Sequence, residues 1–215
     1  MRRVTYKDGY IYKSYSKQDL LDPIEIIENR INTINHFDWS IPGLLNTLIT
    51  EEENSYVYRQ KYCKQQKKQF YEEVDFSGLL ETLTYFQQIG FVHGDLNKKN
   101  IFWTKEGFKV LDYEPSLFQF KNGRKQFMTT KPYFSKKEVK DGEISFLTDK
   151  IAFFYFILRI NGGFSNRKLI ELTRTFNHRS VLGVSEIELN ELSYKSILNI
   201  ALERLKNIIL VKQIK

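Results

Sequence analysis

Cysteine is almost absent from this 215-residue chain, whose one thiol is Cys63. A single cysteine excludes an internal disulfide framework and a cysteine-based metal site, and it is compatible with a reducing compartment. Long apolar runs are lacking as well. The most apolar stretch, Ile151 to Leu158, lies between Lys150 and Arg159 and is far shorter than the ~20 residues that cross a bilayer. It predicts a buried helix, and the sequence predicts no transmembrane segment.

Export signals, repeats and linkers are also missing. The N-terminal Met1-Arg2-Arg3 leads into alternating Tyr and Lys residues, without an apolar run of the signal-peptide type. We therefore expect a cytoplasmic protein, while delivery into another cell by a machine that needs no cleaved signal stays open. No repeat, low-complexity tract or linker marks a second domain, so we predict one domain over residues 1–215.

The charge balance is moderately basic. The chain has 33 Lys and Arg residues against 26 Asp and Glu residues, a formal charge of +7. A surface of this sign attracts anions, nucleotides among them, but the excess is too small to indicate nucleic-acid binding, and we expect no nucleic-acid partner. A hydrophobic fraction of 41% is sufficient for one globular unit with a sizeable core.

The most informative stretch is the polar loop that follows Phe91 and Val92. It carries Asp95 and, five positions later, Asn100, and a predicted short hairpin then ends on Asp112. The two strands of that hairpin would bring three oxygen-bearing side chains together. Phosphoryl transfer from ATP requires such a set: one carboxylate to orient the attacking hydroxyl, and an amide and a second carboxylate to hold magnesium ions. The alternative is a polar surface loop, because Asp and Asn are common in turns.

The order H-G-D-x-x-x-x-N, hairpin, hydrophobic-D resembles the catalytic loop and metal-binding motif of the protein-kinase-like superfamily, which includes aminoglycoside and choline kinases. The resemblance implies an α+β, protein-kinase-like bilobal fold. Its β-sheet lobe would be reduced and would span residues 1–62, and a mainly helical lobe would span residues 63–215. ATP and Mg²⁺ are the cofactors that the resemblance implies.

The same resemblance gives roles to residues of the loop and the hairpin end. It implies that Asp95 orients the acceptor hydroxyl and that Asn100 and Asp112 hold magnesium. Glu114 adds a carboxylate beside the metal site. Lys99 lies where tyrosine kinases carry a catalytic-loop arginine, and it would neutralise the transferred phosphoryl group unless it merely faces solvent.

A β-hairpin is predicted near the N-terminus. Strands at Val4–Tyr6 and Tyr10–Tyr15 flank Lys7-Asp8-Gly9, whose Asp-Gly pair is typical of a tight turn. Ile11-Tyr12-Lys13 resembles the kinase V-A-I-K segment, whose lysine contacts the nucleotide phosphates. The resemblance therefore implies that Lys13 binds the cofactor; the alternative is a lysine at a solvated edge.

A helix is predicted from Asp22-Pro23-Ile24-Glu25, with Asp at the cap and Pro at the first helical position. Four isoleucines then recur at helical spacing: Ile24, Ile27, Ile31 and Ile34. In kinases a glutamate of this helix pairs with the strand lysine. Glu28 is favoured for that pair over Glu25, because Glu25 has a competing role in the cap.

The resemblance places the hinge between the lobes around Gln60, Lys61 and Tyr62, where adenine hydrogen-bonds to the backbone. Strands are predicted at Leu44–Ile49 and Ser55–Arg59. A helix is predicted over Ser77–Ile89, with Gly90 as its stop, and it would deliver the chain to the catalytic loop.

Later segments bear on the acceptor. Thr129 to Glu138 resembles the T-x-x-Y-x-x-P-E end of a protein-kinase activation segment, with Lys137 in place of proline. Kinases bury an aspartate at the start of the following helix, where it accepts hydrogen bonds from the catalytic-loop backbone. Asp149 takes that supporting role together with His93, although it could also serve as a helix N-cap or first-turn acid. A long helix is predicted over Glu186–Val211.

Three departures limit the resemblance. No glycine-rich phosphate-covering loop is present, so we expect either weak nucleotide affinity or partial substitution by the backbone amides of Lys7-Asp8-Gly9. Gly94 replaces an arginine that reads activation-segment phosphorylation in many protein kinases, so control by that route is not expected. Tyr113-Glu114 replaces Phe-Gly after Asp112.

The leading hypothesis from the sequence is a minimal, atypical kinase that transfers the γ-phosphoryl group of ATP to protein Ser or Thr. A small molecule or a glycolipid sugar is the alternative acceptor, favoured by His93-Gly94-Asp95. A pseudokinase or binding module is the alternative of another class. The missing glycine-rich loop supports it, and the intact Asp95, Asn100 and Asp112 oppose it.

Overall fold

The computed structural model describes residues 3–66, 74–113, 120–121, 125–126, 145–160 and 183–213. The strands are β1 (Arg3–Lys7), β2 (Tyr10–Ser16), β3 (Thr47–Glu51), β4 (Ser55–Lys61), β5 (Ile101–Thr104), β6 (Gly107–Val110), β7 (Phe120–Lys121) and β8 (Lys125–Gln126). The helices are a 3-10 turn (Lys17–Asp19), α1 (Ile24–Asn35), α2 (Ser77–Gln88), α4 (Phe146–Ile160), α7 (Glu186–Glu191) and α8 (Tyr194–Gln213).

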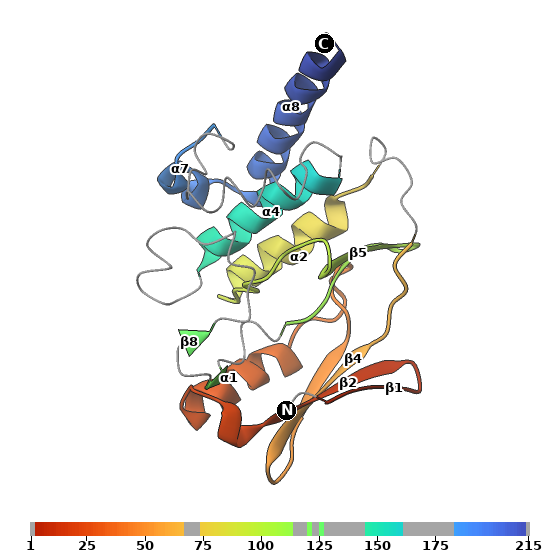
Figure 1. The fold of residues 1–215 in the computed structure, drawn as a ribbon, viewed down its shortest axis with the longest axis vertical. Coiled ribbons are helices and arrows are strands. Elements are labelled where there is room, and N and C mark those ends of the chain that lie inside the picture. Colours follow the sequence, from red (N-terminus) through yellow and green to blue (C-terminus); the bar gives the residue numbers. More distant parts are fainter. Residues whose placement is uncertain are drawn as a thin grey trace.

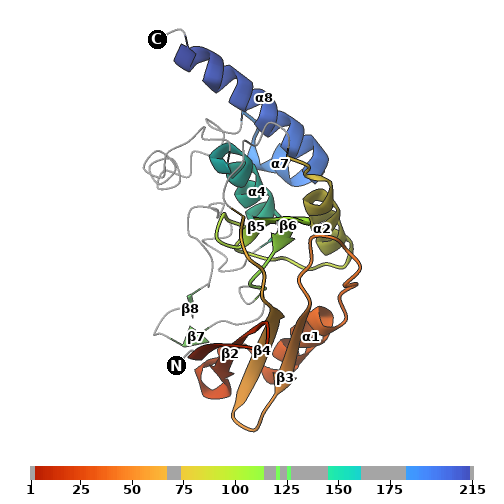
Figure 2. The ribbon, with the colours of Figure 1, turned by 90° about the vertical axis from the view of Figure 1, so that its right-hand side faces the viewer.

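These elements form two lobes. Figure 1 shows the sheet of β1 to β4 with α1 in one lobe and α2, α4, α7 and α8 in the other, and Figure 2 agrees in placing the β5–β6 hairpin between them. The sheet is antiparallel, in the order β1-β2-β4-β3. The predicted α+β class, with a small sheet lobe and a mainly helical lobe, is confirmed.

The N-terminal hairpin forms as predicted. Asp8 and Gly9 have φ values of 50° and 78°, which Asp tolerates and Gly adopts readily. The register then pairs Lys13 with Val4 on β1 and with Tyr58 on β4. Because directly opposed residues point to the same face of a sheet, Lys13 lies on the face that also carries Tyr58.

Helix α1 differs from the prediction at its start. Pro23 occupies the N-cap position, and its carbonyl accepts the amides of Ile26 and Ile27. Asp22 is one residue too early to cap, and it forms an ion pair with Arg30 at 2.5 Å instead. Ile27 packs in the core with Ile31 and Ile34, but Ile24 is 57% exposed, so the predicted apolar stripe is one turn too long.

The helical lobe is built around α4. All eight residues of Ile151–Leu158 belong to the core, which confirms the predicted buried helix. Lys150, also buried, donates to the carbonyl of Asn190 and so links α4 to α7. No helix in the described part of the chain has the length and apolar character that crossing a membrane requires.

The predicted helix Glu186–Val211 is two helices. Ser185 caps α7 in a capping box with Glu188, and Leu192 is extended, with ψ of 145°. The Ser193 hydroxyl then accepts the amide of Ser196 at 3.1 Å, as an N-cap does at the start of α8. The apolar periodicity continues through this break, which is why the sequence pattern concealed it.

Aromatic rings join the two lobes. Phe37, which follows α1, lies 5.0 Å from Phe91 and 5.6 Å from Tyr113 between ring centroids, and Phe86 of α2 lies 4.8 Å from Phe91. Phe91 precedes the polar loop and Tyr113 follows Asp112. The two contacts of Phe37 are edge-to-face and therefore directional, so the cluster fixes both ends of the segment that carries the candidate site.

Gly43 is a close-packed point between α2 and the β5–β6 hairpin. Its carbonyl accepts the amide of Val110 at 2.8 Å, and a Cβ there would lie 2.1 Å from Thr82 Oγ1 and 3.0 Å from the Gly78 carbonyl oxygen. We expect Gly43→Ala to lower the free energy of unfolding by about 1–3 kcal/mol through overpacking, measured by urea denaturation.

Gly78→Ala is the matched control. A Cβ at Gly78 would make an ordinary 3.4 Å contact with Pro42, and alanine favours the helical backbone. We expect no loss of stability. Equal stability of Gly43→Ala and the wild type would contradict the packing described here.

Candidate active site

The polar loop is closed by its own amides and carbonyls. Asn100 Nδ2 donates to Asp95 Oδ2 at 2.9 Å and to the Asp95 carbonyl at 3.0 Å. The carbonyl of Asn97 accepts the amides of Asn100 and Ile101, and its side-chain oxygen accepts the amide of Lys99 at 2.8 Å. Asp95 and Asn100 are therefore held side by side.

His93 joins this loop to the segment before Asp112. The imidazole is fully buried. Its Nδ1 accepts the amide of Asp95 at 3.2 Å, and its Nε2 lies 2.8 Å from the carbonyl oxygen of Leu111. Because Nδ1 accepts a hydrogen bond, Nε2 carries the proton and donates it to Leu111. The ring thus sets the separation of the two backbone segments.

Asp149 holds the loop from the other side. Its carboxylate is 1% exposed and accepts the amide of His93 at 2.7 Å and that of Gly94 at 2.8 Å. Gly94 has φ of 82°, a left-handed conformation that favours glycine. Burial, with a smaller contribution from the Asp149 carboxylate, raises the pKa of Tyr194 on α8 well above its usual value.

Asp112 pairs with Lys13. Lys13 Nζ lies 2.6 Å from Asp112 Oδ1 and 5.0 Å from the centroid of the Tyr58 ring. Lys13 is 4% exposed, whereas the side chain of Asp112 is 38% exposed. The amide of Leu111, the residue before Asp112, donates to the carbonyl of Asn100 in the polar loop at 2.8 Å.

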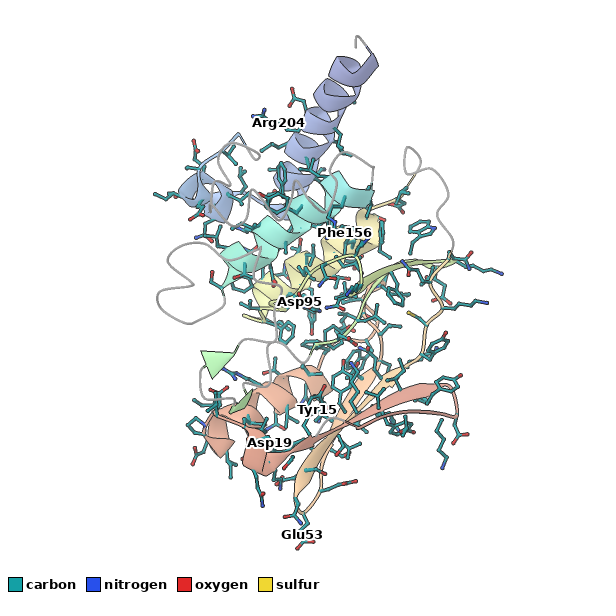
Figure 3. All side chains as sticks on the ribbon, in the orientation of Figure 1. Tyr15, Asp19, Glu53, Asp95, Phe156 and Arg204 are labelled. Atoms are coloured by element: carbon teal, nitrogen blue, oxygen red, sulfur yellow. The ribbon has the colours of Figure 1, made fainter. Side chains whose placement is uncertain are left out.

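The structure therefore brings together Lys13, Asp95, Asn100 and Asp112. Figure 3 shows Asp95 on the side of the helical lobe that faces the sheet. The chain of contacts runs from Lys13 to Asp112, along the backbone to Leu111, and on through Asn100 to Asp95. Lys99 is exposed on the same loop.

Glu28 does not join this set. It lies on the exposed side of α1, since the side of the helix that packs in the core carries isoleucines, and Lys13 pairs with Asp112 instead. The charge of Glu28 acts on Lys17, whose pKa is raised chiefly by its hydrogen bond to Glu51. The implied Lys13–Glu28 pair is therefore not formed in this structure.

The hinge backbone is largely engaged within the protein. The amide of Lys61 donates to the Asn46 carbonyl at 2.9 Å, and the amide of Tyr62 donates to the Gly9 carbonyl at 2.8 Å. An adenine ring at this segment would have to use other backbone groups. Gln60 is 1% exposed, and its side chain accepts the amide of Asp112, so the side chain belongs to the site, which the residue type alone did not indicate.

The Asp8–Gly9 turn does not substitute for a glycine-rich loop. Its contact with Tyr62 places it at the hinge end of the sheet, and Lys13 is four residues further along β2, or about 13 Å away at the rise of an extended strand. Of the two alternatives, the one in which the amides of this turn lie at the phosphates is therefore wrong. Glu114 and the segment Thr129–Glu138 lie outside the described residues.

Comparisons with known proteins find likenesses among solved structures only. No family model and no curated protein matches the sequence. Among solved structures, the chain is similar to the kinase PK-1 of Cydia pomonella granulovirus, with a TM-score of 0.50 and 13% sequence identity. The fold is kinase-like. The match covers 72% of this chain and 62% of the viral kinase, so this chain spans less than two thirds of that protein.

The buried carboxylate of Asp149 gives a stability prediction. Asp149→Ala leaves the amides of His93 and Gly94 without their acceptor, and we expect the free energy of unfolding to fall by about 2–4 kcal/mol, measured by urea denaturation. The exposed Asp75, which accepts the Ser77 amide at 2.8 Å, is the control: Asp75→Ala should cost clearly less. Equal losses for the two variants would contradict the role of Asp149.

Cys63 gives a pH prediction at the hinge. Burial raises the pKa of the Cys63 thiol to about 11, and only the thiolate reacts with alkylating agents. We expect iodoacetamide to modify the folded protein slowly at pH 8 and about tenfold faster for each pH unit up to pH 11. Urea-unfolded protein should react with a midpoint near pH ~8.5. A midpoint below pH 9 in the folded protein would refute the burial of this thiol.

Proposed function

We propose that this protein is an ATP- and magnesium-dependent phosphotransferase that passes the γ-phosphoryl group to a hydroxyl acceptor. The observation that carries the proposal is the continuous set of contacts joining Lys13, Asp112, Asn100 and Asp95. If these residues only formed surface turns, the buried Lys13 of the sheet lobe would have no reason to pair with Asp112.

The donor set suits magnesium, which takes few, hard oxygen ligands. Both hydrogen bonds of Asn100 Nδ2 go to Asp95, so the Asn100 side chain has Oδ1 left for a cation. Asp112 offers Oδ2, which accepts no hydrogen bond from the described residues. Bound magnesium would supply charge neutralisation for the phosphates.

The protein groups have separate roles in this proposal. Asp95 accepts the hydrogen bond of the acceptor hydroxyl and orients it, while Asn100 fixes the direction of the Asp95 carboxylate. Lys13, already paired with a carboxylate, exchanges that anionic partner for the anionic phosphates. Catalysis then consists of positioning and charge neutralisation, which are the main contributions in phosphoryl transfer.

Protein Ser or Thr is the acceptor that we favour. It is supported by the two hydrogen bonds from the loop backbone to Asp149 and by the activation-segment resemblance of Thr129–Glu138. His93-Gly94-Asp95 favours a small molecule or a glycolipid sugar as the second candidate. The position of the Asp8–Gly9 turn, far from Lys13, favours a pseudokinase as the candidate of another class.

Labelled ATP with magnesium, offered to a general protein substrate, a cell lysate and a sugar panel, tests the proposal. We expect transfer by the wild type and a loss of about 100-fold or more in Asp95→Asn and Asp112→Asn, since each removes a charged group from the reacting centre. Asp75→Asn, at an exposed helix start, is the control and should keep the wild-type rate.

The outcomes separate the candidates. Labelled protein supports the favoured acceptor, and labelled sugar with unlabelled protein supports the second. Magnesium-dependent thermal stabilisation by ATP without transfer or hydrolysis would replace the proposal with a pseudokinase. Transfer that survives in both Asp95→Asn and Asp112→Asn would refute the assignment of the site.

A further inference from the structure

Gln60 makes two hydrogen bonds in the interior of the sheet lobe. Its Oε1 accepts the amide of Asp112 at 3.3 Å, and its Nε2 donates to Thr47 Oγ1 at 3.0 Å. Thr47 in turn donates to the Leu45 carbonyl at 2.8 Å. Gln60 is 1% exposed and Thr47 is 2% exposed, so this relay is shielded from water.

The hydrogen bond from Thr47 to the Leu45 carbonyl determines which way the Gln60 amide is oriented. Because the Thr47 hydroxyl donates its proton to Leu45, it can only accept from Gln60. The nitrogen of the Gln60 amide therefore faces Thr47, and its oxygen faces the amide of Asp112. Breaking either bond would leave a buried polar group unsatisfied, which is costly.

Asp112 needs such support because its backbone is strained. Its φ is 56°, a left-handed conformation that costs a non-glycine residue free energy and persists where the surroundings determine it. Gln60 accepts its amide, and Tyr58, two positions earlier on the same face of β4, accepts the next amide, that of Tyr113, at 3.2 Å. Lys13 holds the carboxylate. All three supports come from the sheet lobe.

We propose that Gln60 is a positioning residue that sets the orientation of Asp112 for metal binding, acting through its side chain from the sheet lobe. The inference rests on the proposed function, because it assigns Asp112 to magnesium. It adds a side-chain role to the hinge position that the kinase resemblance implies for Gln60. A displacement of β4 would then move the backbone of Asp112 and, with it, the carboxylate proposed to bind the metal.

Amide hydrogen exchange in the nucleotide-free protein tests the contact itself. We expect Gln60→Leu, of similar volume, to accelerate exchange at Asp112 about fivefold or more through loss of its acceptor. The neighbouring amide of Leu111, bonded to Asn100, should keep its rate. Thr47→Val should accelerate Asp112 in the same direction, while Thr47→Ser, which keeps the hydroxyl, should restore the wild-type rate.

Magnesium dependence tests the consequence. With ATP present, we expect Gln60→Leu to raise the magnesium concentration for half-maximal thermal stabilisation about tenfold, as loss of a residue that orients a metal ligand does. Asn35→Leu is the matched control, because the Asn35 amide also makes two hydrogen bonds, to the backbone of Ile49, but does not touch Asp112. It should lower the melting temperature without changing the magnesium requirement.

The outcomes distinguish this inference from the proposed function. Faster Asp112 exchange together with a raised magnesium requirement supports it. Unchanged exchange of the Asp112 amide in Gln60→Leu overturns it, and so does an equal shift in the magnesium requirement of Asn35→Leu. In either case, binding of magnesium and ATP by the wild type leaves the proposed function standing. A wild type that ATP and magnesium do not stabilise overturns both.

Discussion

A buried lysine needs a counter-charge, and in this protein that need joins the two lobes. Lys13 is 4% exposed, and an ammonium group so placed would be costly without a carboxylate. Its partner, Asp112, comes from a segment 99 residues later in the chain. The ion pair holds the candidate metal ligand against the sheet, at a residue whose backbone is left-handed.

The other half of the site depends on the buried carboxylate of Asp149. Asp149 is stabilised by the amides of His93 and Gly94, and the His93 imidazole then bonds to Leu111. Helix α4 therefore contacts the polar loop of residues 93–100 through Asp149, whereas the sheet contacts Asp112 through Lys13 and Gln60. Leu111 is bonded to both His93 and Asn100, so the loop itself sets the separation of Asp95 from Asp112, and the sheet orients Asp112.

Features with a local signal could be predicted from the sequence. The Asp8–Gly9 hairpin follows from its turn residues and the Ile151–Leu158 helix from its unbroken apolar run, and the kinase-like motif located the loop and the strand end of the site. Competition between neighbouring residues could not be predicted. Asp22 does not cap α1, because the carbonyl of Pro23 already accepts the amides of Ile26 and Ile27 in the first turn. The role of Gln60 was also hidden, because it depends on a register that places β4 beside Asp112, 52 residues away.

The position of the N-terminal turn decides how phosphates could be held. In a kinase-like fold, backbone amides of a glycine-rich turn contribute an anion-binding concavity. Here Gly9 contributes a carbonyl to the hinge, and the described residues place no such turn beside Lys13. In the proposed function, the phosphates would therefore be bound by the ammonium of Lys13 and by a cation held at Asn100 and Asp112. Charge interactions of this kind are strong only in a shielded and well-ordered setting. Lys13 is shielded, whereas Asp112 is 38% exposed and depends on the contacts from the sheet that order it.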